Sequence, residues 1–357
     1  MALKIRGFLR SVTLALAFNV AAVSPLFAQR LRDDKPDRYA SIVIEETTGK
    51  VLYERDAAQQ LHPASTTKLM TAYLVFRALE SGKLAREQEL PVSAFAAGQP
   101  STNLFMMKDI PIKKTVTGKD GRKRTIVAGT EKRQMVDSIS VENALRGMLC
   151  HSANDAAVVF AESIGGSQAE FVRLMNEEAQ RLGMKHTVFT NPNGLPDTSQ
   201  HTTVEDMARL ARALIEDFPD YYEYFSIRTF NFNGHVFHNT NKLLGAYVGL
   251  DGLKTGWIAS SGFNLVASAE RNDQRVIGIV FGAARPEERN EDMRRLLDFA
   301  FQKLKNPKAV FVNGLKTPAG ERYVELPPRE APPDSSTELK PPAPKVVFGD
   351  KSVSPPG

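Results

Sequence analysis

Cysteine is nearly absent from this 357-residue chain, whose only one is Cys150. A single cysteine excludes an intramolecular disulfide and any metal site built from several thiolates. Hydrophobic residues make up 42% and charged residues 24%, proportions typical of a globular protein and not of a disordered chain or a multi-span membrane protein. Stability must therefore come from a packed hydrophobic core, for which the chain is long enough.

A large excess of either charge is also absent, since 46 basic and 41 acidic residues leave a net charge of +5. The excess is local: residues 1–28 carry three basic and no acidic residues, and residues 108–133 carry nine basic and three acidic ones. The rest of the chain is net negative, so we expect no nucleic-acid partner. We predict instead that residues 108–133 contact an anionic wall or membrane surface.

The N-terminal residues 1–28 have the pattern of a signal peptide. Three basic residues precede the mostly apolar run 11–24, and Ala28 lies just before Gln29. The apolar run is shorter than the roughly 20 residues that a spanning helix needs. We therefore predict export with cleavage after Ala28, followed by a linker over residues 29–37.

The next part of the chain alternates between strand and helix patterns. Residues 41–46 and 51–54 flank turn residues and predict a hairpin. Residues 65–79 are apolar on nearly every face, which predicts a buried helix. Residues 140–217 are mainly helical by pattern and include two capping boxes, Ser167 with Glu170 and Thr203 with Asp206.

Strand patterns return after this helical lobe. A hairpin is predicted over 229–237, two further strands over 263–270 and 275–282, and a helix over 287–304. Strands at both ends of the region with helices between them predict an α+β domain over 38–305, in which the terminal strands pair in one antiparallel sheet. Nine of the 21 prolines lie from Pro327 onward, so residues 306–357 are predicted to be a linker-like tail.

Three short motifs occur in order along the chain: Ser65-Thr66-Thr67-Lys68, Ser152-Ala153-Asn154 and Lys254-Thr255-Gly256. Each alone is common, but their order and spacing together are specific. Ser65 begins the predicted buried helix, where the helix dipole stabilises an oxyanion. Lys68 lies on the same face, and burial together with a second cation, for which Lys254 is the candidate, would lower its pKa. Such a lysine can activate Ser65 as a nucleophile.

The second and third motifs add groups that suit peptide chemistry. Ser152 can relay a proton, and Asn154 offers an amide for Lys68 and for a substrate carbonyl. We expect Lys254 and Thr255 to bind a carboxylate, and Gly256 to leave the strand edge open to a substrate backbone.

The backbone N–H groups of Ser65 and Trp257 are predicted to form an oxyanion hole.

The motif set resembles that of the low-molecular-mass penicillin-binding proteins, specifically the serine-type D-alanyl-D-alanine carboxypeptidases. The resemblance covers about residues 38–304 and includes blocks at 63–72, 152–155, 191–196, 208–225 and 252–256. It implies a transpeptidase-like fold, an antiparallel sheet flanked by helices plus a helical lobe, with the active site between them. It also implies removal of the terminal D-alanine from peptidoglycan pentapeptide stems through an acyl-enzyme on Ser65, covalent trapping by β-lactams, and no metal or cofactor.

The sequence departs from this family at four places. Ala153 stands where a glycine is usual, and residues 108–133 form an insertion. We expect residues 306–357 to hold only a truncated form of the family's C-terminal domain. Residues 341–357 lack the pattern of a terminal amphipathic anchor, so we expect a periplasmic protein without one.

Three alternatives stay open from the residues. Class A β-lactamases share the motifs but add a glutamate that activates the deacylating water, and no Glu-x-x-Leu-Asn loop lies between the second and third motifs. A D,D-endopeptidase that cleaves peptidoglycan cross-links needs the same residues. A non-catalytic wall-binding protein would not need all of them.

Other residues with reactive side chains have simpler interpretations. The apolar neighbours of Cys150 indicate a buried hydrophobic residue. His151 either touches the site or ends a helix. His235 and His238 resemble a metal pair only in spacing, because no third ligand is evident.

Overall fold

The computed structural model describes residues 37–307. The predicted signal peptide and the proline-rich tail lie outside the described residues. Within the described part, no helix is both long enough and apolar enough to cross a bilayer.

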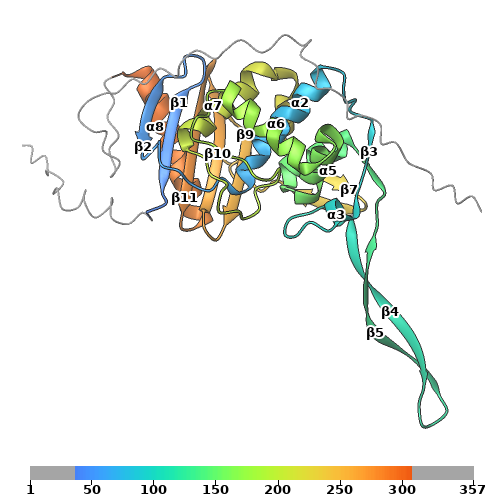
Figure 1. The fold of residues 1–357 in the computed structure, drawn as a ribbon. Coiled ribbons are helices and arrows are strands. Elements are labelled where there is room, and N and C mark those ends of the chain that lie inside the picture. Colours follow the sequence, from blue (N-terminus) through green and yellow to red (C-terminus); the bar gives the residue numbers. More distant parts are fainter. Residues whose placement is uncertain (1–36, 308–357) are drawn as a thin grey trace, which may run out of the picture.

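The centre of the fold is a five-stranded antiparallel sheet with the strand order β2-β1-β11-β10-β9 (Figure 1). Its strands are β1 (Ala40–Glu45), β2 (Val51–Arg55), β9 (Leu250–Ile258), β10 (Gly262–Arg271) and β11 (Gln274–Ala283). β1 pairs with β11, with Ile42 opposite Ile279. The prediction that the terminal strands pair in one sheet is therefore confirmed.

Both faces of the sheet are covered, so most residues of its central strands β1, β10 and β11 are buried. Side chains alternate along a strand, so Ile277 and Ile279 of β11 join one core cluster while Val276 and Val280 join another. Helix α8 (Pro286–Lys305) packs on the second cluster, and it matches the helix predicted over 287–304.

The helical lobe covers the first cluster. It consists of α2 (Lys68–Glu80), α4 (Val141–Arg146), η2 (Gly147–His151), α5 (Asn154–Gly165), α6 (Gln168–Arg181), α7 (Val204–Asp217) and η3 (Pro219–Ser226). The cap residues Ser167 and Thr203 accept hydrogen bonds from the backbone N–H groups of Glu170 and Asp206, as predicted.

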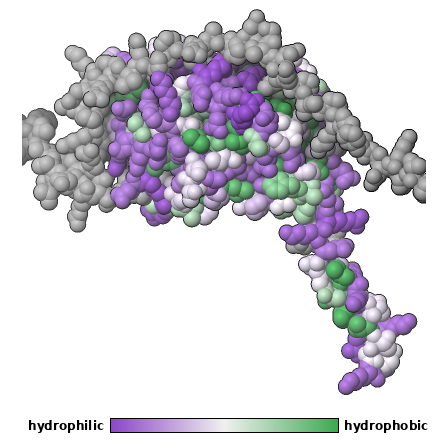
Figure 2. All heavy atoms as spheres, viewed as in Figure 1, coloured by the Kyte–Doolittle hydropathy of each residue, from purple (hydrophilic) through white to green (hydrophobic). Residues whose placement is uncertain are grey.

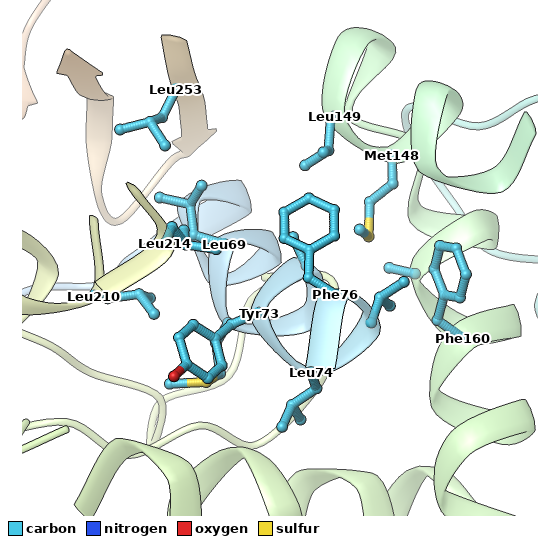
Figure 3. Close-up of a cluster of buried hydrophobic side chains, with 14 of the residues drawn as sticks. Leu69, Tyr73, Leu74, Phe76, Met148, Leu149, Phe160, Leu210, Leu214 and Leu253 are labelled. Atoms are coloured by element: carbon cyan, nitrogen blue, oxygen red, sulfur yellow. The ribbon is translucent and has the colours of Figure 1, made fainter. Parts of the chain in front are cut away.

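Helix α2 runs through the middle of the domain, and eleven of its 13 residues are buried. Figure 3 shows Leu69, Tyr73 and Phe76 of α2 among side chains that come from the surrounding lobe and from β9. The predicted buried helix is thus confirmed, although its first residues form a 3-10 turn, η1 (Ala64–Thr67). A helix packed on all sides can hold a reactive group at its start with little freedom to move.

Three small ribbons and a short helix complete the described fold. β3 (Glu89–Pro91) pairs with β6 (Ser138–Ser140), α3 spans Ala94–Ala97, and β7 (Thr229–Phe232) pairs with β8 (His235–His238) as the predicted hairpin. Between α3 and β6, β4 (Met107–Thr117) and β5 (Lys123–Gln134) form a long ribbon that projects from the body (Figure 1). Residues 108–133, predicted as an insertion, make up almost all of this ribbon.

Candidate active site

The first motif lies in a turn whose backbone is fixed by the sheet. Ser65 belongs to η1, which leads directly into α2. Asn264 of β10 donates from Nδ2 to the carbonyl oxygens of His62 at 3.0 Å and Pro63 at 3.1 Å. The hydroxyl of Thr66 donates to the same Pro63 oxygen at 2.7 Å. The position of the Ser65 backbone therefore depends on a strand some two hundred residues away in the sequence.

A second long-range contact comes from the loop that precedes α7. Gly194 has φ +82°, and a Cβ there would lie 1.9 Å from the carbonyl oxygen of Ala64. Only glycine fits this close approach. Ala64 itself has φ +50°, a conformation that costs a non-glycine residue on the order of 1 kcal/mol. The loop 191–196 thus packs against the turn that presents Ser65.

Lys68 is completely buried, and its Nζ lies among three oxygens. Nζ is 3.0 Å from Ser65 Oγ, 2.7 Å from Asn154 Oδ1 and 2.5 Å from the backbone oxygen of Asn193. The structure therefore brings the Ser65 hydroxyl within hydrogen-bond distance of the amine that was predicted to activate it.

Electrostatics favour the neutral form of this amine. Burial lowers the pKa of Lys68 well below its ordinary value, and the positive charge of Lys254 lowers it further, while the Asp155 carboxylate acts in the opposite direction. Both causes that the sequence predicted are present. A lysine with a lowered pKa can accept a proton near neutral pH.

The second motif follows a single π-turn, η2, of the kind often found at functional sites. Ser152 is buried and has φ +71°, and its backbone N–H donates to the carbonyl oxygen of Gly147. Ala153 has φ −56° and is also buried. Its conformation does not require the glycine usual in the family, so the extra methyl group is accommodated.

Asn154 links Lys68 to the segment that leads into the ribbon. Its Oδ1 accepts from Lys68, its Nδ2 donates to the Pro100 oxygen at 2.9 Å, and its backbone N–H donates to the Thr102 oxygen at 2.8 Å. The predicted contact of Asn154 with Lys68 is thus present, and the remaining bonds fix the loop 99–106 beside the site.

The third motif occupies the edge strand β9. Lys254 is buried, and its Nζ donates to the backbone oxygen of Thr255 at 2.9 Å. Burial, and then the charge of Arg289, lower the pKa of Lys254 to about 7. The Thr255 hydroxyl donates to Thr240 Oγ1 at 2.7 Å.

Gly256 also lies close to the nucleophile turn. A Cβ at Gly256 would lie 3.0 Å from both the Pro63 oxygen and the Ser65 nitrogen. A side chain there would therefore press on the turn that presents Ser65, which is a second reason for a glycine beside the predicted room for a substrate backbone. Gly256, which directly precedes Trp257, thus lies against Ser65. Ser65 and Trp257 are the two residues predicted to supply the oxyanion hole.

The side chain of Trp257 is 57% exposed. Its ring lies beside that of Phe263, with 5.9 Å between centroids.

Sequence reasoning missed several residues that position the site. The Asn193 side chain donates to Gln99 at 3.0 Å, and the Asp155 carboxylate accepts from the Leu104 N–H at 2.7 Å. Asn264, described above, is completely buried. One signal was available: Asn264 is a polar residue directly before the apolar run Leu265–Ala267 of β10.

Two other residues with reactive side chains, Cys150 and His151, are packed against neighbouring side chains or buried. Cys150 is buried, and burial raises its thiol pKa to about 11, which agrees with its interpretation as a hydrophobic residue. His151 ends η2 and packs against Phe237 with 4.7 Å between ring centroids. Burial lowers its pKa.

Comparisons with known proteins all point to one family. The family model of the D-alanyl-D-alanine carboxypeptidases of peptidase family S11 matches residues 32–128 and 107–285. The D-alanyl-D-alanine carboxypeptidase DacF of Bacillus subtilis is 33% identical over 291 residues, which are 80% of this chain and 68% of that protein. DacC of Escherichia coli is 34% identical over 305 residues, 83% of this chain and 70% of the relative.

Solved structures show the same fold. Penicillin-binding protein 6B of Escherichia coli superposes with a TM-score of 0.64 at 33% identity, covering 74% of this chain and 77% of that one. Penicillin-binding protein D2 of Listeria monocytogenes, solved in its ampicillin-bound form, gives a TM-score of 0.61 at 30% identity, covering 73% and 96%. The α+β transpeptidase-like fold is thus confirmed, and the chain belongs to the S11 family of serine-type D-alanyl-D-alanine carboxypeptidases.

Proposed function

We propose that this chain hydrolyses the terminal D-Ala-D-Ala bond of peptidoglycan pentapeptide stems, with Ser65 as the nucleophile. The observation that carries the proposal is the 3.0 Å contact between Lys68 Nζ and Ser65 Oγ, made by an amine whose pKa is lowered by burial and by Lys254. A nucleophile and an adjacent base are the parts that acyl transfer needs.

Acylation then proceeds in two steps. Ser65 Oγ attacks the carbonyl carbon of the penultimate D-alanine while Lys68 Nζ accepts the hydroxyl proton. The C–N bond breaks, and the departing amine of the last D-alanine takes a proton from Lys68 through Ser152. Asn154 holds Lys68 in place through the 2.7 Å hydrogen bond.

Charge around the substrate is balanced by two backbone N–H groups and by the third motif. The backbone N–H groups of Ser65 and Trp257 bind the oxyanion of the tetrahedral intermediate. Lys254, protonated up to its pKa of about 7, attracts the terminal carboxylate of the stem, and Thr255 and Gly256 complete this wall of the site.

Hydrolysis of the acyl-enzyme returns Ser65 to its starting state. A water molecule attacks the ester carbonyl while Lys68 accepts its proton. The bond between the carbonyl carbon and Ser65 Oγ then breaks, Ser65 Oγ takes the proton back from Lys68, and the stem leaves one residue shorter. A β-lactam acylates the same oxygen, because its ring amide resembles the scissile peptide in chemistry. Export to the periplasm would place the enzyme beside its substrate.

The substrate experiment separates this reaction from cross-link cleavage. The purified protein is incubated with a pentapeptide stem and, separately, with a cross-linked dimer of stems. Release of free D-alanine from the first with little monomer from the second supports the carboxypeptidase. Monomer release as the main reaction would instead assign an endopeptidase.

Ser65→Ala is the matched control in both incubations. If neither product forms with the unmodified chain, or if product still forms with Ser65→Ala, the proposal is wrong. Binding of stem peptides without turnover would instead indicate a non-catalytic wall-binding protein.

A further inference from the structure

The β4–β5 ribbon pairs with no other strand among the described residues, although Gln134 at its base donates to the Val92 oxygen. Its two strands form a separate two-stranded sheet, and from Pro111 to Arg133 nearly every residue is exposed. A two-stranded ribbon is only marginally stable in water by itself. A surface that covers one of its faces would stabilise it.

Cross-strand pairing places three aliphatic side chains on one face. Ile112 lies opposite Gly129, Ile126 opposite Lys114, and Val116 opposite Arg124. Directly paired residues share a face, and so do residues two apart on a strand. Ile112, Ile126 and Val116 are 42%, 44% and 38% exposed, and Figure 2 shows hydrophobic residues gathered along the ribbon between hydrophilic ones.

This aliphatic face, defined by Ile112, Val116 and Ile126, is surrounded by positive charge. Residues 111–134 carry eight basic and two acidic residues. One of the acidic residues, Asp120, accepts from Arg124 at 2.7 Å and from the Arg122 N–H at 3.1 Å, so it orders the tip of the ribbon.

We propose that the aliphatic face of the β4–β5 ribbon binds the surface of a bilayer that contains anionic lipids. Exposed aliphatic side chains gain free energy in the acyl boundary of a membrane, while the surrounding lysines and arginines attract anionic headgroups. Both features are needed for a lipid surface, whereas an anionic glycan or wall polymer uses the charges alone and leaves the aliphatic residues in water.

The length of the ribbon sets the geometry of binding. Eleven residues in β4 at about 3.3 Å each extend roughly 35 Å. A bilayer bound at the outer half of the ribbon is therefore held at a distance from the body of the domain, from which the ribbon projects (Figure 1).

The test is sedimentation of the secreted full chain with vesicles of phosphatidylcholine alone or mixed with phosphatidylglycerol. We expect binding to the anionic vesicles only, weakened by salt. Lys114→Glu reverses one charge beside the aliphatic face and should weaken binding at least about fivefold.

A matched pair of variants tests the face itself. Ile126→Ser and Val127→Ser change neighbouring residues that pair with Lys114 and Lys113 and so point to opposite faces. We expect Ile126→Ser to weaken vesicle binding several-fold more than Val127→Ser, with unchanged β-lactam labelling as the check of folding. The proposal is overturned if the two variants weaken binding equally, or if the protein binds neutral and anionic vesicles equally. It is also overturned if the protein binds isolated sacculi but not vesicles.

Discussion

The active site and the β4–β5 ribbon both contain lysines, but the two regions hold them in opposite environments. Lys68 and Lys254 are buried, and burial lowers the pKa of each. Lys113 and Lys114 of the ribbon are exposed. A buried lysine gains reactivity because desolvation disfavours its proton, whereas an exposed lysine keeps its charge for attraction at a distance. Burial thus lets Lys68 act as a base, whereas exposure suits the ribbon lysines to binding by charge.

The largest effect is expected when the nucleophile Ser65 is removed. Ser65→Ala deletes the only atom that we expect to form the acyl bond, so labelling by a fluorescent penicillin should be lost entirely. The circular dichroism spectrum should not change, because Ser65 is only half-buried. Persistent labelling of the folded variant would rule out Ser65 as the nucleophile.

The next largest effect is expected at the buried base. Lys68→Ala removes the proton acceptor, and we expect the acylation rate to fall by about 10²- to 10⁴-fold. Non-covalent binding of a stem peptide should change much less. Stopped-flow acylation and equilibrium binding measure the two separately, and a variant that acylates at the unmodified rate would exclude Lys68 as the base.

Two glycines test how tightly each region is packed. Gly256→Ala places a methyl group 3.0 Å from the Ser65 nitrogen, and we expect acylation about tenfold to a hundredfold slower. Gly129→Ala in the ribbon meets nothing within 4 Å and should leave acylation unchanged. Similar rates for both variants would show that the approach of β9 to Ser65 does not matter for the reaction.

The pH dependence of the free energy of unfolding tests whether burial lowers the pKa of Lys254. The pKa of Lys254 is about 7 in the folded protein and 10.5 ordinarily. Between these values the unfolded chain binds a proton that the folded chain does not, so stability rises with pH. The rise approaches about 1.4 kcal/mol per pH unit.

Urea unfolding between pH 7 and 8 measures this slope, mostly below the ordinary pKa of 9.0 at which the Cys150 thiol ionises in the unfolded chain. Lys254→Met removes this group and should lower the slope by up to about 1.4 kcal/mol per pH unit, leaving the part that comes from Lys68, whose pKa is also lowered. Parallel curves for the two proteins would contradict the lowered pKa.

The smallest effect is expected from shortening the ribbon. Replacing residues 111–130 by Asn-Gly closes a short hairpin between Ile110 and Glu131, which are paired neighbours. We expect turnover of a soluble pentapeptide within about twofold of the unmodified protein, because exposed residues far from the site contribute little to its stability. A large loss of turnover would show that the ribbon belongs to the active site.

The sequence predicted much of the fold because strand and helix patterns are local. The hairpin near the start, the paired terminal strands, the buried helix and the final helix follow from side-chain periodicity, and the structure contains each of them. The three motifs also pointed to a site made from α2, the turn before α5 and β9.

The contacts that place the site could not be read from local patterns. Asn264 binds the turn before Ser65, Gly194 packs on that turn, and the Asn193 oxygen accepts from Lys68. Each contact joins residues far apart in the chain, and nothing in the neighbouring sequence specifies its partner. Gly256 shows the consequence, because its close approach to the Ser65 turn became evident only once its neighbours in space were known.

The sequence by itself determined which chemical groups are available: a serine with a lysine three positions later, a second lysine in an apolar strand, and a basic insertion. Tertiary structure alone decided how those groups behave. Packing removes water from Lys68 and places Lys254 near it, which lowers the pKa of the first lysine. The ribbon stays in solvent with its aliphatic and basic side chains exposed. Desolvation depends on neighbours in space, which local sequence does not specify.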